Sequence, residues 1–260
     1  MRRLVLFGDS WTNGYYRSTS ERGYDFFDRC LGTEISERFG VEVQNFGERA
    51  NSNQKIANQI IRYVQQEDCS NTAMFIVWSE LQRMPVVYKH LAREDGSTID
   101  HPDYLTHMTT EIYREVRKIY PEIGDIAFSR MYNEHCIHGI RMILKENNIP
   151  YLFANSIDNF WHRRRKNHNI YTGNSRSEFI GGGQEHNTLL DILIGLYDNE
   201  KYANQDINLK DKRYLINALR VKNSHDVNNT MTECEHPTEK GVELIVDKIQ
   251  PELEKILKEK

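Results

Sequence analysis

Hydrophobic and polar positions alternate in blocks along the first third of the chain. Short, nearly continuous apolar runs are typical of strands buried on both faces of a parallel sheet. Such a run occurs at 3–7, and two further strands are predicted at 41–46 and 72–79. Between them, apolar residues recur at helical spacing over 24–40 and 52–66, and the first of these segments ends on Gly40, a typical helix stop. This alternation predicts an α/β fold with a doubly wound parallel sheet.

The pattern changes after Met84. A helix-rich stretch follows, with predicted helices over 103–120 and 130–148. The apolar run at 150–156 predicts a return to the sheet, and an amphipathic helix over 236–257 closes the chain. The intervening residues 157–230 are polar and irregular. We therefore expect one domain over residues 1–260, with insertions at about 84–125 and 157–230.

Polar segments follow each of the three amino-terminal strands. They read "GDSW" at 8–11, "GERANSN" at 47–53 and "WSELQR" at 78–83. In doubly wound sheets, ligands bind beyond the carboxyl ends of the strands. The sequence therefore predicts a functional site at this edge of the sheet.

Composition and charge exclude several classes of partner. The chain is 38% hydrophobic and 28% charged, and its net charge of −4 argues against nucleic acid as a bulk partner. Its apolar runs fall short of the roughly 20 residues that span a bilayer. The first apolar run is also too short for the core of a signal peptide. We expect a protein made in the cytoplasm, with no membrane partner. The oligomeric state stays open.

Neither the cysteines nor the histidines form a metal or disulfide pattern. The four cysteines lack paired spacing, which argues against a disulfide framework. They are Cys30, Cys69, Cys136 and Cys234. On a helix, His135 and His138 share a face from which Cys136 points away. The glycines at 181–183 lack the Lys-Ser/Thr ending of a phosphate loop. We expect no metal and no cofactor.

Two segments at opposite ends of the chain resemble one enzyme family. "FGDSWTNGY" at 7–15 resembles the first block of the SGNH (GDSL) hydrolases. "ECEHPTEKG" at 233–241 resembles their last block, a carboxylate three residues before a histidine that is followed by Pro-Thr and a helix. The resemblance covers about half of the chain. It implies a flavodoxin-like, three-layer α/β/α fold and a serine esterase that needs no metal.

The resemblance assigns the catalytic roles to Ser10, His236 and Glu233. A serine hydroxyl becomes a useful nucleophile when a histidine removes its proton, and a carboxylate orients that histidine. The family usually carries aspartate where this chain has Glu233, but glutamate can do the same work. Glu235 is the rival carboxylate, but it is adjacent to His236, and adjacent residues on a turn point apart, so Glu233 is preferred. Asp9 is expected to shape the turn through backbone hydrogen bonds.

The oxyanion hole departs from the family pattern. The family uses the backbone N–H of the nucleophile, here Ser10, and that of a second-block glycine, which falls on Ala50 or on Gly47. Its third donor is the asparagine of Gly-x-Asn-Asp, but Glu80 occupies that position, and an ionised glutamate cannot donate. Trp-Ser followed by an arginine, as in "WSELQR", resembles the third block of viral and phage members of the family. If a phage encodes this chain, the resemblance implies association with the virion. The remaining candidate donors are Ser79, Arg83, Asn51 and Asn53.

The substrate is less closely defined. Trp11, Ser79, Asn51 and Arg83 are candidate contacts, and Trp161 in "WHRRRKNH" could stack against a sugar unless that segment is only a solvated loop. A small-molecule or carbohydrate ester, such as an O-acetyl sugar, is the expected substrate. Two alternatives remain open. The missing asparagine favours a hydrolase-fold binding or virion-associated protein that has lost catalysis, and an acyltransferase would use the same residues.

The departure at Glu80 yields a test. If residues 80–83 turn helically, Glu80 and Arg83 share a face and can pair. Arg83→Ala should then lower kcat/KM by about ten- to a thousandfold in a folded protein, as expected for the loss of one electrostatic stabiliser. Glu80→Asn should leave turnover of p-nitrophenyl acetate equal or higher. Loss of turnover in a folded Glu80→Asn variant would contradict this assignment of the third block.

Overall fold

The computed structural model describes residues 2–17, 24–49, 51–79, 126–157, 178–183, 188–197, 216, 230–232 and 236–258. Within them, four parallel strands form one sheet in the order β4-β1-β5-β6. They are β4 (Val43–Asn45), β1 (Arg3–Phe7), β5 (Thr72–Trp78) and β6 (Tyr151–Asn155). A small antiparallel pair joins β2 (Tyr15–Arg17) to β3 (Tyr24–Phe26). The parallel sheet confirms the architecture predicted from the alternating pattern.

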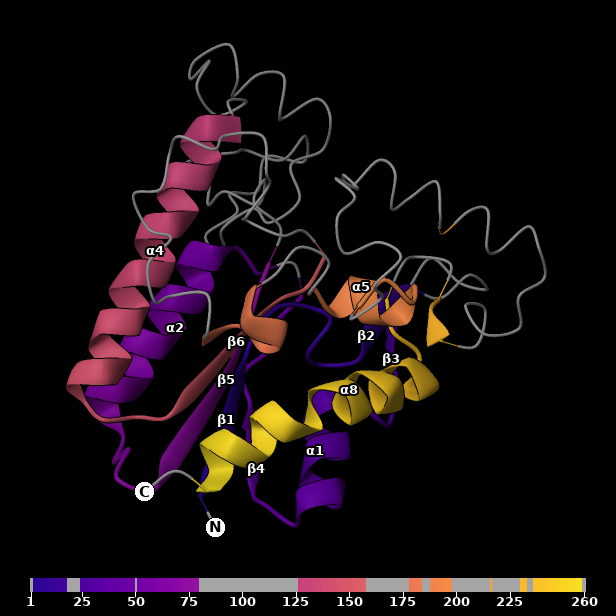
Figure 1. Ribbon diagram of the computed structural model, residues 1–260, viewed down its shortest axis with the longest axis horizontal. Coiled ribbons are helices and arrows are strands. Elements are labelled where there is room, and N and C mark those ends of the chain that lie inside the picture. Colours follow the sequence, from indigo (N-terminus) through magenta and orange to yellow (C-terminus); the bar gives the residue numbers. More distant parts are fainter. Residues whose placement is uncertain are drawn as a thin grey trace, which may run out of the picture.

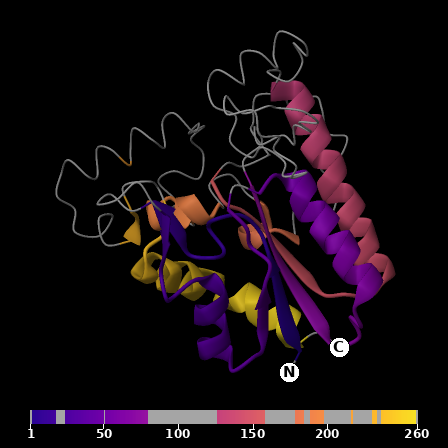
Figure 2. The ribbon, with the colours of Figure 1, turned by 180° about the vertical axis from the view of Figure 1, so that it is seen from behind.

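Helices cover both faces of the sheet. One face carries α1 (Leu31–Phe39) and α8 (Glu239–Lys258), and the other carries α2 (Asn53–Gln66) and α4 (Ile126–Glu146) (Figures 1 and 2). Two shorter elements, η3 (Ile180–Gly183) and α5 (Leu189–Leu193), complete the described part. This is the three-layer α/β/α arrangement expected from the sequence. Among the described helices, none is long and apolar enough to cross a membrane.

The two faces of the sheet carry separate hydrophobic cores. Leu4 and Leu6 pack in the core that includes residues of α1 and α8, whereas Val5 and Phe7 pack in the core beneath α2 and α4. Successive strand side chains point to opposite faces, so a strand covered on both sides is apolar at every position. This is why β5 reads as a continuous apolar run, and all of its residues are buried.

The helix expected over 24–40 is shorter than predicted. Residues 24–26 form β3, and α1 begins only at Leu31. The Phe27 N–H donates to the Gly14 carbonyl (3.0 Å), and Cys30 is extended with φ −119° and ψ 177°, so the chain is held in an extended path before the helix starts. The predicted stop is confirmed, because Gly40 adopts the left-handed conformation (φ 61°) that closes a helix.

Part of the expected second insertion belongs to the core. Ile180 in η3 and Leu189 and Leu190 in α5 are buried in the core shared with α8. Thr188 forms an isolated parallel bridge with Asn155, the last residue of β6. Apart from residues 157, 178–183, 188–197, 216 and 230, the expected insertion 157–230 lies outside the described residues. All of 84–125, with the helix expected over 103–120, also lies outside them.

The start of α8 is held against a short upstream segment. The Thr238 N–H donates to the Thr230 carbonyl (3.0 Å), and the Gly241 N–H donates to the Thr238 hydroxyl (3.2 Å). A Cβ atom placed on Gly241 would lie 2.0 Å from the Thr230 carbonyl oxygen. Only glycine therefore allows this close approach.

Two helical glycines give a matched pair for testing this approach. Gly241→Ala should lower the free energy of unfolding by about 1–3 kcal/mol, because the added methyl group overpacks the contact with Thr230. Gly139→Ala in α4 should raise it by about 0.5–1 kcal/mol, because alanine favours the helix and its Cβ would meet nothing within 4 Å. Urea denaturation of both variants measures the two changes. Equal effects of the two substitutions would contradict the close approach.

Candidate active site

Ser10 lies on a tight turn directly after β1. Both the N–H and the hydroxyl of Thr12 donate to the Asp9 carbonyl, at 3.1 and 2.7 Å. A Cβ on Gly8 would lie 2.4 Å from the Thr12 side chain, and one on Gly47 would lie 1.8 Å from it. These two glycines therefore make room for Thr12 and let the turn close.

The turn stands at the topological switch point of the sheet. From β1 the chain passes through α1 to β4 on one side, and then through α2 to β5 on the other side of β1. Ligands bind at such points because the outgoing connections diverge there. The polar segments that the sequence places after β1, β4 and β5 consequently start at the same edge.

His236 is brought to Ser10 from the far end of the chain. Its Nε2 lies 2.8 Å from the Ser10 Oγ, although 226 residues separate the two positions. The backbone of His236 is fixed on both sides by Thr232, whose hydroxyl accepts its N–H (3.0 Å) and whose N–H donates to its carbonyl (2.8 Å). The Trp11 ring centroid lies 6.5 Å from the imidazole centroid. The imidazole is thus positioned to accept the Ser10 proton.

The carboxylate of the expected triad lies outside the described residues. Glu233 and Glu235 both fall in the segment 233–235, between Thr232 and His236. The residues that flank this segment, Thr232 and His236, are joined by a backbone hydrogen bond. The choice between the two glutamates stays a prediction.

Asp9 connects the ends of three strands. Its side chain is fully buried, and its Oδ1 accepts the Trp11 N–H (3.0 Å), in line with the expected role in shaping the turn. Its Oδ2 accepts the hydroxyls of Ser79, after β5 (2.9 Å), and of Ser156, after β6 (3.4 Å). Buried carboxylates require such partners. Asp9 therefore holds the turn that carries Ser10 against the carboxyl ends of β5 and β6.

Sequence reasoning missed Ser156 and Thr232. The polar ending of the apolar run at 150–156 was a usable signal for Ser156. For Thr232 no local signal existed, because its role is to pair with the backbone of His236.

The structure does not support Gly47 as an oxyanion donor. Its N–H already donates to the Asn45 Oδ1 (2.9 Å), and its carbonyl accepts the Asn13 amide (3.1 Å). The alternative donor, Ala50, lies outside the described residues.

The side-chain amides of the two candidate asparagines also donate their hydrogens to other groups of the fold. The Asn51 amide donates its two hydrogens to the Gly8 carbonyl (2.8 Å) and the Gln59 Oε1 (3.0 Å). The Asn53 amide donates to the Ser79 carbonyl (3.0 Å) and the Asn133 Oδ1 (2.7 Å). An amide group has only two hydrogens, so neither side chain retains one for an oxyanion or a substrate.

Two expected substrate contacts have structural roles instead. Ser79 is 1% exposed and donates its hydroxyl to Asp9, and its N–H donates to the Asn53 Oδ1 (2.7 Å). Trp11 is 1% exposed and belongs to the hydrophobic core. Their burial leaves almost no surface for a substrate. Arg83, Glu80 and Trp161 lie outside the described residues.

The described cysteines and histidines do not gather into a metal site. Within the described part of the chain, no group of three or more His, Cys, Asp or Glu side chains is arranged to hold a metal ion. Cys30, Cys69 and Cys136 are free thiols. Burial raises the pKa of the Cys136 thiol and so favours its protonated form, which is a poor metal ligand.

The family described as GDSL-like Lipase/Acylhydrolase matches residues 4–249 of the chain. No curated protein matches it. Similar solved structures include a lipase/acylhydrolase from Enterococcus faecalis, with 15% identity, coverage of 100% of this chain and 99% of that chain, and a TM-score of 0.34. A carbohydrate acetylesterase family member from Sinorhizobium meliloti has 9% identity, 99% coverage of both chains and a TM-score of 0.43. A lipolytic G-D-S-L family protein from Veillonella parvula has 12% identity, 96% coverage of both chains and a TM-score of 0.40.

The Asp9 contacts can be tested by removing the carboxylate. Asp9→Ala should lower the free energy of unfolding by about 3 kcal/mol, because it strands three buried donors without an acceptor. Ser156→Ala should cost about 1 kcal/mol or less, because it removes only the longest of the three contacts. Urea denaturation followed by tryptophan fluorescence compares them. An unchanged midpoint for Asp9→Ala would contradict the role of Asp9 as the connection between the strands.

Proposed function

The chain belongs to the GDSL-like lipase/acylhydrolase family, and on that premise we propose that it is a serine esterase with Ser10 as the nucleophile. Membership of this family makes it an ester hydrolase in general. The observation that carries the specific proposal is the 2.8 Å contact between the Ser10 Oγ and the His236 Nε2. A nucleophile and its general base must lie within hydrogen-bond reach in this way.

The reaction follows from this pair. His236 must start as the neutral tautomer with its proton on Nδ1, so that Nε2 can accept the Ser10 proton as Oγ attacks the ester carbonyl carbon. The imidazolium then gives that proton to the leaving alcohol when the carbon–oxygen bond breaks. Water, deprotonated by His236, then attacks the acyl carbon, and the imidazolium returns the proton to the Ser10 Oγ as the acid is released. Glu233 is the proposed partner of Nδ1.

The proposed oxyanion hole uses fewer of the candidate donors than the sequence offered. Gly47, Asn51, Asn53 and Ser79 already donate their hydrogens within the fold. The proposal therefore uses the backbone N–H groups of Ser10 and Ala50, with the Arg83 guanidinium as the third donor. Such preorganised donors stabilise the negative oxygen of the tetrahedral intermediate.

The proposed substrate is a small acyl ester, such as an acetyl group on a carbohydrate. The polar residues of 157–230 support this choice because they include tyrosines, asparagines and arginines, as well as Trp161 in a basic segment. Aromatic and arginine side chains bind sugars and anionic groups better than lipid chains.

Ser10→Ala should lower kcat/KM for p-nitrophenyl acetate by at least about a thousandfold, because the covalent step is lost. His236→Ala should have a similar effect, and the double variant should fall little further, because the two residues act as a unit. Ser70→Ala is the matched control, since Ser70 is exposed and precedes β5 at the opposite edge of the sheet. Its activity should equal that of the wild type.

A fluorophosphonate probe separates this proposal from a binding protein of the same fold. The wild type should be labelled on Ser10, whereas Ser10→Ala should not. Failure of the folded wild type to react with the probe and to turn over the ester would overturn the esterase proposal and favour the binding protein.

A further inference from the structure

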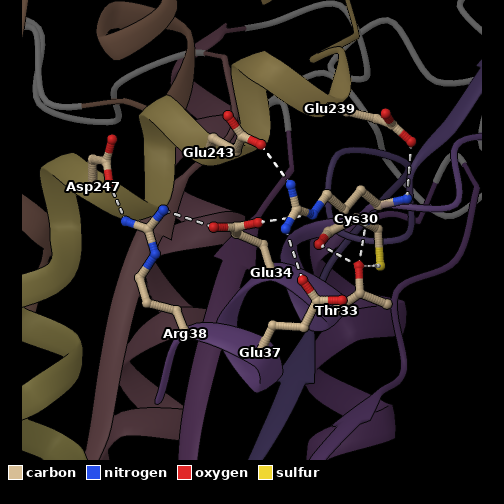
Figure 3. A network of polar contacts seen from close by, with 9 residues as sticks. Cys30, Thr33, Glu34, Glu37, Arg38, Glu239, Glu243 and Asp247 are labelled. Carbon is tan, nitrogen blue, oxygen red and sulfur yellow. Dashed lines mark hydrogen bonds and ion pairs between the residues drawn. The ribbon is translucent and has the colours of Figure 1, made fainter. Parts of the chain in front are cut away.

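A network of charged side chains joins α1 to α8, and Arg29 lies at its centre. The Arg29 guanidinium contacts Glu34 (3.2 Å) and Glu37 (2.7 Å) on α1. It also contacts Glu243 on α8 (2.6 Å), and the backbone N–H of Arg29 donates to the Glu239 carboxylate (3.3 Å). Figure 3 shows Glu34, Glu37 and Glu243 converging between the two helices, with Glu239 at the start of α8.

The contacts on α8 lie at the end nearest to the catalytic pair. Glu239 is the first residue of α8 and follows His236 by only three positions. The Val242 N–H donates to the Thr238 carbonyl (2.8 Å), which closes the first turn of the helix. Arg29 therefore contacts the helical turn to which the His236 segment is joined.

The other side of Arg29 is connected to the nucleophile turn. Just before Arg29, the Phe27 N–H donates to the Gly14 carbonyl (3.0 Å). The Asn45 amide donates to the Thr12 carbonyl (2.9 Å) and contacts the Cys30 Sγ (3.7 Å), which adjoins Arg29. These bonds hold the segment before α1 against residues 12–14. Arg29 thus links the part of the chain that carries Ser10 to the part that carries His236.

An arginine is suited to this position for a geometric reason. Its planar guanidinium carries five N–H donors, so one side chain can bind several carboxylates at once, whereas a lysine ammonium is a point charge. Glu34 is only 4% exposed and binds Arg29 through one oxygen and Arg38 through the other (2.7 Å). The exposed pairs contribute little energy individually. Their shared partner, however, restricts where α8 can lie relative to α1.

We propose that Arg29 is a positioning residue that holds the first turn of α8, and through it His236, at hydrogen-bond distance from Ser10. The part that concerns catalysis rests on the proposed esterase function. Without the Arg29 side chain, Glu243 loses its cationic partner and is repelled by the like charges of Glu34 and Glu37, whereas the backbone N–H of residue 29 can still donate to Glu239. The start of α8 then moves away from α1, and proton transfer from Ser10 slows.

Arg38 provides a matched control. It also joins α1 to α8, since it binds Glu34 on its own helix and Asp247 on α8. Asp247 lies about two turns further along α8 than Glu239. Removing either arginine side chain therefore deletes one bridge between the same two helices. The bridge lost with Arg29, at Glu243, lies about one helical turn closer to His236 than the bridge lost with Arg38, at Asp247.

The experiment compares the full-length wild type with Arg29→Ala, Arg29→Lys and Arg38→Ala. Hydrogen exchange of the segment 236–242 reports the order of the first turn, independently of any chemistry. In Arg29→Ala it should exchange about tenfold faster, as expected for a locally opened helix end. In Arg38→Ala it should stay within about twofold of the wild type, even if the melting temperature falls. Arg29→Lys should be intermediate.

The rate of fluorophosphonate labelling reports the catalytic pair. Arg29→Ala should label about ten- to a hundredfold more slowly, because a small displacement of a catalytic group has effects of this size. Arg38→Ala should label at the wild-type rate. If Arg29→Ala does not fold, Glu243→Gln supplies the same test, since it removes one carboxylate from α8 and leaves Glu34 paired. Its effects should be several-fold and in the same direction.

Two results would overturn the proposal. The first is hydrogen exchange in the first turn of α8 that is as slow in folded Arg29→Ala, or in Glu243→Gln, as in the wild type. The other is an equal fall in labelling for the Arg29 and Arg38 variants, which would show a general loss of stability. If the fluorophosphonate does not label the wild type, but hydrogen exchange of 236–242 in Arg29→Ala rises as expected, the esterase proposal fails and the positioning of α8 by Arg29 stands.

Discussion

The buried carboxylate of Asp9 is the contact on which the site depends. A fully buried carboxylate is tolerated only when its oxygens are hydrogen-bonded. The Asp9 oxygens find their partners on the nucleophile turn itself and on the hydroxyls that follow β5 and β6. The ends of three strands must therefore meet in one arrangement. Because Ser10 is the next residue after Asp9, this arrangement also fixes the position of Ser10.

The catalytic pair depends on a second set of long-range contacts. A parallel sheet places the carboxyl ends of its strands at one edge, so Ser10 after the first strand lies at the same edge as Ser79 after β5 and Ser156 after β6. His236 reaches that space from the loop before α8, and the network around Arg29 joins α8 to α1. Glycine at position 241 permits the close packing that keeps the His236 segment in place.

The sequence placed Ser10 and His236 at positions that the structure brings together, but it could not show which candidate donors already have partners. The placement of Ser10 after the first strand and of His236 before the last helix follows from local patterns, and the structure brings the two side chains together. The errors concern Gly47, Asn51, Asn53 and Ser79, all of which were candidate donors. Their hydrogens are donated to Asn45, Gly8, Gln59, Ser79, Asn133 and Asp9. A list of residue types cannot show which hydrogens a fold has already used.

The sequence by itself determined the layers of this protein. Hydrophobic periodicity is a local property, so the buried strands, the covering helices and the helix stop at Gly40 could be read along the chain. Only the tertiary structure decided the start of α1, the incorporation of Ile180 and Leu190 into the core, and the polar groups left available at the site. These three features depend on contacts between residues far apart in the sequence. The role of a polar group at the site is set by the buried partner that it contacts.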